Sequence, residues 1–202
     1  MLRSLDGKIL ASGDLIQVAK DDQVTSEIVF HFKDGSHHET SVFSQDHTFR
    51  LLSDHLVQQG PSFPHPIDIL IEASKNEVTI DASDKGKEKD ATQHIDLPED
   101  ASNGMILTLL KNISPSSPET KVSMLTTSSK PRLVKLSITA RGERAFNVAG
   151  STRKATDFDT KIEIAGVAGV IPPLVGKKRR LPPTFDIHPN QPHIREIRGF
   201  TL

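Results

Sequence analysis

Apolar and polar residues alternate along residues 24–33, and this alternation predicts a β-strand with one face on a core. One side of this strand carries the even-numbered residues Val24, Ser26, Ile28, Phe30 and Phe32, which are mostly apolar. The opposite side carries Thr25, Glu27, His31 and Lys33. A period of two is what a half-buried strand requires. Asp34-Gly35 follows, a dipeptide that favours a tight hairpin turn with positive backbone angles. Two more extended segments reach Gln59, so this region predicts an antiparallel meander.

The same alternation recurs on both sides of the meander. Asp6-Gly7, between two apolar segments, is a second hairpin signature. Apolar and polar residues also alternate in residues 67–82, on both sides of a turn at Ser74-Lys75-Asn76. This pattern predicts a two-stranded unit with one solvent-exposed face. We expect the core side of this unit to hold Ile69, Ile71, Val78 and Ile80. A weaker strand is expected at residues 87–97.

Three further strands are predicted in the second half of the chain. The first lies near residues 122–126, and the second carries Val134, Leu136 and Ile138, with Lys135, Ser137 and Thr139 toward water. Arg141-Gly142-Glu143 is expected to turn the chain. Residues 156–165 then alternate again, with Phe158, Ile162 and Ile164 on one parity.

The pattern changes to a helical period between Pro98 and Ile113. Five apolar residues fall on one helical stripe there: Met105, Ile106, Leu109, Leu110 and Ile113. We therefore predict a helix near residues 99–113. Its firmest part is Met105 to Asn112, because Gly104 weakens the first turn. A single amphipathic helix among strands is expected to plug the open end of a curved sheet.

Together these elements predict a mainly β protein: a curved antiparallel sheet or partly open barrel with one amphipathic helix and an irregular C-terminal tail. We assign residues 1–176 to a single antiparallel β-domain and residues 177–202 to the tail. In that tail alternation stops and prolines are frequent, which excludes a central strand.

Composition narrows the functional classes. The chain has no cysteine, so disulfides, thiolate metal sites and cysteine nucleophiles are excluded. Its 25 basic and 26 acidic residues give a net charge of -1, so no global field favours nucleic acid. No apolar run approaches the length of a spanning helix, and the first residues lack the pattern of a secretory signal. The chain itself therefore predicts no compartment, no membrane span and no nucleic-acid partner.

Histidines in the meander are the candidate metal ligands, chiefly His31, His37 and His38, with Glu39 and Asp54 nearby in sequence. A zinc site needs three or four converging ligands. His31 lies on the parity opposite the apolar face, so a solvated surface is the favoured interpretation. Metal binding stays the weak alternative, and no cofactor is predicted.

Other chemical patterns are weaker still. Ser62, His65 and Asp68 are the residue types of a catalytic triad, but they lie within one proline-rich loop and strand edge, whereas triads join separated segments. The acids Asp157 and Asp159 are expected on the solvent-exposed face of a strand. We expect no carboxylate to lie in an apolar run where burial would raise its pKa. The basic run at residues 177–180 is expected to be solvated, and the sequence predicts no catalytic residue.

Several stretches resemble an uncharacterised family of bacterial, exported β-rich proteins. They are LDGKILASGDLIQV, VFHFKDGS, TFRLLSDHLVQQGPSFPHPIDI, DLPEDASNGMILTLLKNI, KPRLVKLSIT and IEIAGVAGVIPPLVGK, and they cover about Leu5 to Lys177. The resemblance implies the β fold and a periplasmic or secreted location, and it supplies no catalytic residue. More loosely, the layout is similar to half-barrels that carry lipids or lipoproteins between bacterial membranes.

The tail departs from this pattern, and we interpret it as disordered or as the product of a shifted reading frame. A β-rich chain without Trp or Tyr is expected if its aromatic closing strands were never translated. Residues 194–200, read one base later, permit the F-V-K-F-E-G stretch that the resemblance implies.

The sequence thus favours a non-enzymatic β-domain that binds a small apolar or lipid-like ligand in the bacterial envelope. A filled core is the simpler interpretation of the same apolar residues. The alternative function is a hydrolase or metal-dependent enzyme whose site is not recognisable from sequence. Oligomeric state is not predicted.

Overall fold

A computed structural model describes residues 2–4, 8–84, 87–128, 130–148, 151–163 and 196–197. The expected turn at Asp6-Gly7, the apolar segment at 166–176 and the basic run at 177–180 lie outside these residues. Of the tail, the description covers Glu196 and Ile197 alone.

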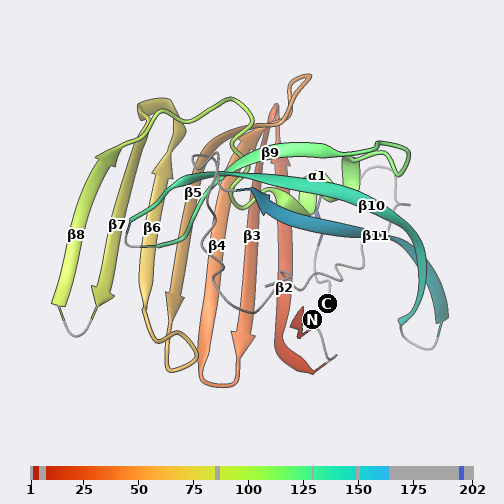
Figure 1. The fold of residues 1–202 in the computed structure, drawn as a ribbon, viewed down its shortest axis with the longest axis horizontal. Coiled ribbons are helices and arrows are strands. Elements are labelled where there is room, and N and C mark those ends of the chain that lie inside the picture. Colours follow the sequence, from red (N-terminus) through yellow and green to blue (C-terminus); the bar gives the residue numbers. More distant parts are fainter. Residues whose placement is uncertain are drawn as a thin grey trace, which may run out of the picture.

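The larger of two antiparallel sheets is a meander in which each strand pairs with the next one along the chain (Figure 1). Its strands are β1 (Leu2–Arg3), β2 (Ile9–Lys20), β3 (Gln23–Phe32), β4 (Gly35–Ser44), β5 (Arg50–Gln59), β6 (Ile67–Glu72), β7 (Glu77–Asp84) and β8 (Lys87–His94). A short 3-10 turn, η1 (Ala73–Lys75), joins β6 to β7. The two-residue strand β12 (Glu196–Ile197) also pairs with β2.

The smaller sheet has the order β11-β10-β9 and runs across one face of the large sheet (Figure 1). Its strands are β9 (Thr120–Leu125), β10 (Leu133–Val148) and β11 (Ser151–Glu163). The helix α1 (Ile106–Asn112) precedes β9 and lies next to it. The predicted fold class is therefore confirmed: mainly antiparallel β with one helix, and no closed barrel among the described strands.

One face of the large sheet, here called the inner face, turns toward α1 and the small sheet. The register of β2 to β6 aligns its side chains in rows across the strands. These residues are Ala11, Gly13, Leu15, Gln17, Val24, Ser26, Ile28, Phe30, Phe32, His37, Glu39, Ser41, Phe43, Leu51, Asp54, Leu56, Gln58, Ile67, Ile69 and Ile71.

Two hydrophobic clusters form the core between the layers. One joins β5, β6 and β7 to Met105 and to Leu125 of β9. The other joins Leu15 of β2 and Ile28 of β3 to α1, β9 and β10. Leu109 packs against both clusters. The helix thus lies inside the layered core, whereas the sequence had suggested a plug at the open end of a sheet.

The helix is also shorter than predicted. It runs from Ile106 to Asn112, which agrees within one residue with the firmest predicted part, Met105 to Asn112, whereas the wider prediction of a start near residue 99 is wrong. Residues 101–105 are instead a buried connection whose first two residues pair with the backbone of Ser123 in β9, and the helix begins only after Met105. No helix among the described residues has the length and apolar character that crossing a membrane requires.

Two of the predicted turns differ in the structure from what the sequence suggested. At the β3–β4 hairpin the loop residues are Lys33 and Asp34, and neither Asp34 nor Gly35 has a positive φ. Gly35 is required for another reason: a Cβ there would lie 2.5 Å from the Gln59 carbonyl oxygen. Arg141-Gly142-Glu143 is not a turn, because Gly142 (φ +110°) forms a bulge inside β10, which continues to Val148.

The second half of the chain follows the predicted faces with two exceptions. Val134, Leu136 and Ile138 are buried, as expected. Ser137, expected to face water, is buried and donates a hydrogen bond to Glu119. Ile162, expected on the apolar side of its strand, is half exposed.

The predicted unit at residues 67–82 is confirmed, with Ile69 opposite Ile80 and all four expected core side chains buried. We predict that Ile80→Ala lowers the free energy of unfolding by about 2–5 kcal/mol, because it removes a fully buried side chain. Thr79→Ala, one residue away on the exposed face, should change it by less than about 0.5 kcal/mol. Urea titrations of the two variants test this, and equal small losses would contradict the assigned register.

Candidate functional site

Five polar side chains interrupt the apolar inner face where β4 and β5 meet, between the two hydrophobic clusters. We call them the inner-face polar cluster: His37, Glu39, Ser41, Asp54 and Gln58. On β4, the inner positions 37, 39 and 41 are polar, and they are followed by the buried Phe43. Such a stretch costs burial energy in a core strand, so its presence calls for a specific explanation.

The strand register brings these residues together. His37 lies opposite Gln58, and Ser41 lies opposite Asp54. Beyond the polar rows the register skips Leu52 of β5, so that Leu51 lies opposite Phe43 and both face the core.

His37 is held by contacts on three sides. The Gln58 amide nitrogen lies 3.0 Å from His37 Nδ1, and because an amide nitrogen can only donate, Nδ1 accepts. The neutral ring then carries its proton on Nε2, which lies 3.7 Å from Glu39 Oε2. The Phe30 ring meets the imidazole edge-on at 5.7 Å between centroids. His37 and Glu39 are partly exposed, at 19% and 15% of their side chains.

Asp54 is the most enclosed acid of the cluster, at 2% exposure. Burial raises the pKa of Asp54 well above its ordinary value, and the negative charge of Glu39 raises it further. The nearby Ser41 hydroxyl acts in the opposite direction. Its contact does not meet the geometry of a hydrogen bond, so Ser41 Oγ and Asp54 Oδ1 lack a partner among the described residues. We therefore infer that Asp54 holds its proton more tightly than an ordinary aspartate.

Gly104 covers Asp54 from the side of the connection that precedes α1. Its φ is +66°, and a Cβ there would lie 2.0 Å from Ser41 Oγ and 2.4 Å from Asp54 Oδ1. The glycine therefore serves two needs, the left-handed backbone and the close approach to β4 and β5.

The adjoining residues tie this connection to the small sheet. The Asn103 side chain accepts from the Leu125 amide at 2.9 Å and donates to the Leu125 carbonyl at 3.0 Å, as a strand residue would. Ala101 forms a parallel bridge with Ser123. The segment from Ala101 to Gly104 thus joins the two sheets.

Asp100, Ser123 and Lys135 form a second polar group on this connection. Lys135 Nζ lies 2.7 Å from both Asp100 Oδ2 and Ser123 Oγ. Burial acts to raise the pKa of Asp100, but hydrogen bonds from Lys135 and Ser123, with the Lys135 charge, hold it below its ordinary value. A serine–lysine pair can act in hydrolysis, yet here Ser123 is fully buried. This group is a structural clamp.

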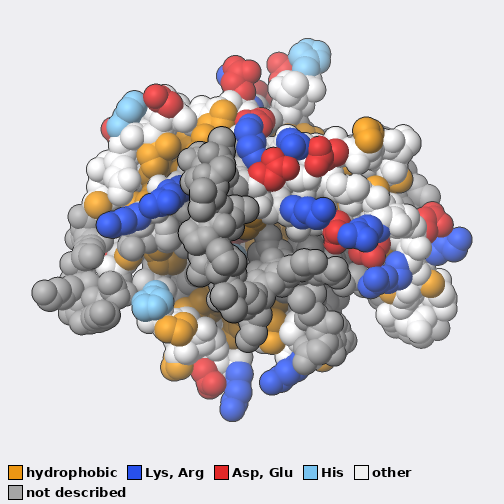
Figure 2. Space-filling view, viewed as in Figure 1, with side chains coloured by type: hydrophobic (Ala, Val, Ile, Leu, Met, Phe, Trp, Pro, Cys, Tyr) orange, Lys and Arg blue, Asp and Glu red, His pale blue; other side chains and the backbone are white. Residues whose placement is uncertain are grey.

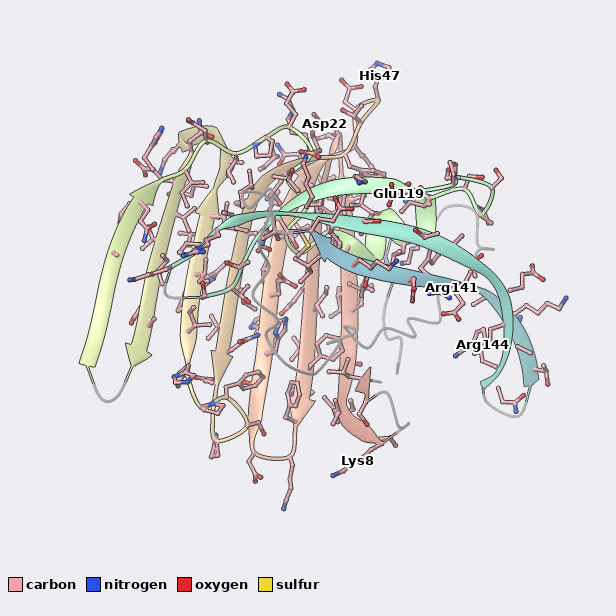
Figure 3. All side chains as sticks on the ribbon, viewed as in Figure 1. Lys8, Asp22, His47, Glu119, Arg141 and Arg144 are labelled. Atoms are coloured by element: carbon pink, nitrogen blue, oxygen red, sulfur yellow. The ribbon has the colours of Figure 1, made fainter. Side chains whose placement is uncertain are left out.

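The three histidines proposed as weak metal ligands lie on two faces of the sheet. His37 is on the inner face, whereas His31 and His38 are exposed on the other. His38 Nε2 lies 2.8 Å from Glu27 Oε1, on that outer face. His47 lies on the loop between β4 and β5, away from the rest (Figure 3). Across the described part of the chain, no three His, Asp or Glu side chains are placed to hold a metal ion.

The remaining sequence candidates take part in surface contacts. Ser62 is exposed in a turn, and Asp68 lies 2.8 Å from His55 on the neighbouring strand. Asp157 pairs with Arg144 at 3.1 Å, and Asp159 pairs with Arg141. Charged side chains of both signs gather over the small sheet (Figure 2), in keeping with these pairs.

The expectation that no carboxylate is buried among apolar residues is wrong for Asp54. The signal was present, because Asp54 shares its parity with Leu56, and Leu56 faces the core. It was obscured by the run Leu51-Leu52, where the register skips Leu52 of β5, so that no simple alternation precedes Asp54. No pattern in β4 or β5 identified Gly104 as their neighbour.

No protein family, curated protein or solved structure matches the chain. The resemblance to an exported bacterial family therefore stays a prediction. What the molecule does must be argued from its own residues.

We predict that Gly104→Ala is strongly destabilising, because it combines backbone strain with a clash against Ser41 and Asp54. Gly142→Ala is the matched control: its φ is also positive, but its Cβ would meet nothing within 4 Å. The Gly104 variant should lose at least about 1 kcal/mol more in urea unfolding, the usual lower cost of overpacking. Equal losses would mean that the close approach is unimportant.

Asp54 should make stability fall as pH rises. Since its pKa is raised on folding, its protonated form favours the native state below the ordinary value of 3.8, and that contribution is lost as pH rises through the raised pKa. Asp54→Asn should therefore become progressively more stable relative to the parent across that interval. Unfolding titrations at several pH values measure this difference. A difference independent of pH would contradict the raised pKa.

Proposed function

We propose that this chain is a non-enzymatic β-domain that binds a small apolar or lipid-like molecule on the inner face of its large sheet. One observation carries the proposal. The partly exposed His37 contacts both Glu39 and Gln58 on a face that is mostly apolar. Ligand sites typically combine mostly apolar and aromatic walls with a few placed polar groups.

Aromatic side chains lie at the same end of the inner face. Phe30 contacts His37, and Phe32 meets Phe63 edge-on at 4.9 Å between ring centroids. All three phenylalanines are only partly buried. Partly buried rings beside polar side chains favour a ligand with an apolar body and one polar end.

An enzymatic role has less support. Asp54, the acid with the clearest change in pKa, is enclosed beneath Gly104 and is not exposed to a substrate. His37 and Glu39 could exchange a proton, but no serine or threonine nucleophile contacts that pair in the interactions of the described residues. A location in the bacterial envelope is part of the proposal, and it rests on the sequence resemblance.

Titration with the neutral fluorescent probe N-phenyl-1-naphthylamine tests the proposal. We expect saturable enhancement of its fluorescence by the parent protein. Gln58→Arg, which places a cation on the inner face, should abolish it. Gln59→Arg is the matched control, because Gln59 is the next residue of β5 and faces outward.

Circular dichroism should show that both arginine variants remain folded. Absence of saturable binding by the parent protein would overturn the proposed function. Equal binding by the two variants would place any binding away from the inner face.

A further inference from the structure

We propose that the polar end of the ligand is a positively charged amine, so that the ligand class is a long-chain amine and not a fatty acid. This inference rests on the proposed function and specifies its ligand. The carboxylate of Glu39, beside His37 and Gln58, is the group that would receive the amine.

The first support is the sign of the charges on the inner face. Along β2 to β6, its two acidic residues are Glu39 and Asp54, and none of its positions there is a lysine or arginine. The lysine and arginine side chains of these strands, Lys20 and Arg50, lie outside the inner-face rows and are exposed. A ligand with a carboxylate or phosphate end would bring a further negative charge to two acids that have no lysine or arginine among the inner-face positions of β2 to β6.

The second support is the environment of Glu39. Its side chain is 15% exposed, and its contact with His37, at 3.7 Å, is longer than a hydrogen bond. The carboxylate therefore keeps lone pairs for a donor. In such a partly enclosed place charges interact more strongly than in water, so the sign of a ligand's charge should matter.

The third support is the effect of the Glu39 charge on Asp54, whose buried Oδ1 and neighbouring Ser41 Oγ have no hydrogen-bond partner in the described part of the chain. The Glu39 charge disfavours ionisation of Asp54. An ammonium group at Glu39 would offset this negative potential, whereas an anion would add to it.

The experiment compares three amphiphiles with the same alkyl chain: dodecylamine, dodecanol and dodecanoate. Each is used below its micelle concentration, at neutral pH, to displace N-phenyl-1-naphthylamine from the parent protein. We expect dodecylamine to displace the probe at a concentration at least about tenfold lower than dodecanoate, with dodecanol between them.

Glu39→Gln should remove most of this preference, leaving the amine and the carboxylate within about twofold of each other. Glu27→Gln is the matched control. Glu27 also contacts a histidine, His38, but on the outer face, and its loss changes the net charge by the same amount. It should leave the preference of the parent protein intact.

The outcomes separate the two proposals. If the probe binds and dodecanoate displaces it as well as dodecylamine does, the amine inference is overturned and the binding function stands. If Glu39→Gln and Glu27→Gln reduce the preference equally, the preference reflects net charge, and the inference is again overturned. If the parent protein binds neither the probe nor any amphiphile, the proposed function itself has failed.

Discussion

The connection between the two sheets is the constraint on which the rest of the structure depends. This connection is four residues long, Ala101 to Gly104. Ala101 forms a bridge with β9, and the side-chain amide of Asn103 bonds to the backbone of Leu125. Gly104 lies close against β4 and β5. The position of α1 follows, because the helix begins two residues later. From there Thr108 accepts a hydrogen bond from Gln17 of β2 at 2.6 Å. A change in this connection would therefore alter the contacts of both layers.

The polar residues of the molecule divide into two kinds. The clamp of Asp100, Ser123 and Lys135 is charge-balanced and fully bonded, and it stabilises the contact between segments far apart in sequence. The inner-face polar cluster has two acids and no lysine or arginine among its five members, and two of its oxygen atoms lack a hydrogen-bond partner in the described part of the chain. Ser41 and Asp54 are enclosed beneath Gly104. A molecule from outside would therefore meet the partly exposed members of the cluster, His37, Glu39 and Gln58, as we propose.

Much of the fold could be predicted from the sequence because its strands are half-buried and antiparallel. Alternation located Ile69 and Ile80, and their burial and register agree with it. It could not show that Gly142 is a bulge, since a glycine is equally compatible with a turn. The candidate site was harder, because it depends on the pairing of β4 with β5 and on a glycine that lies fifty residues further along the chain. No local pattern records such a long-range contact.

The meander also has a consequence for how the chain folds. Each strand from β1 to β8 pairs with its neighbour in sequence, so the large sheet can grow one hairpin at a time with short loops to close. The helix differs, because the hydrogen bond that attaches it to the large sheet joins Gln17 to Thr108 across 91 residues. Contacts of high sequence separation form slowly. We therefore expect an early large sheet and a later docking step, with the apolar inner face exposed to solvent in the interval between them.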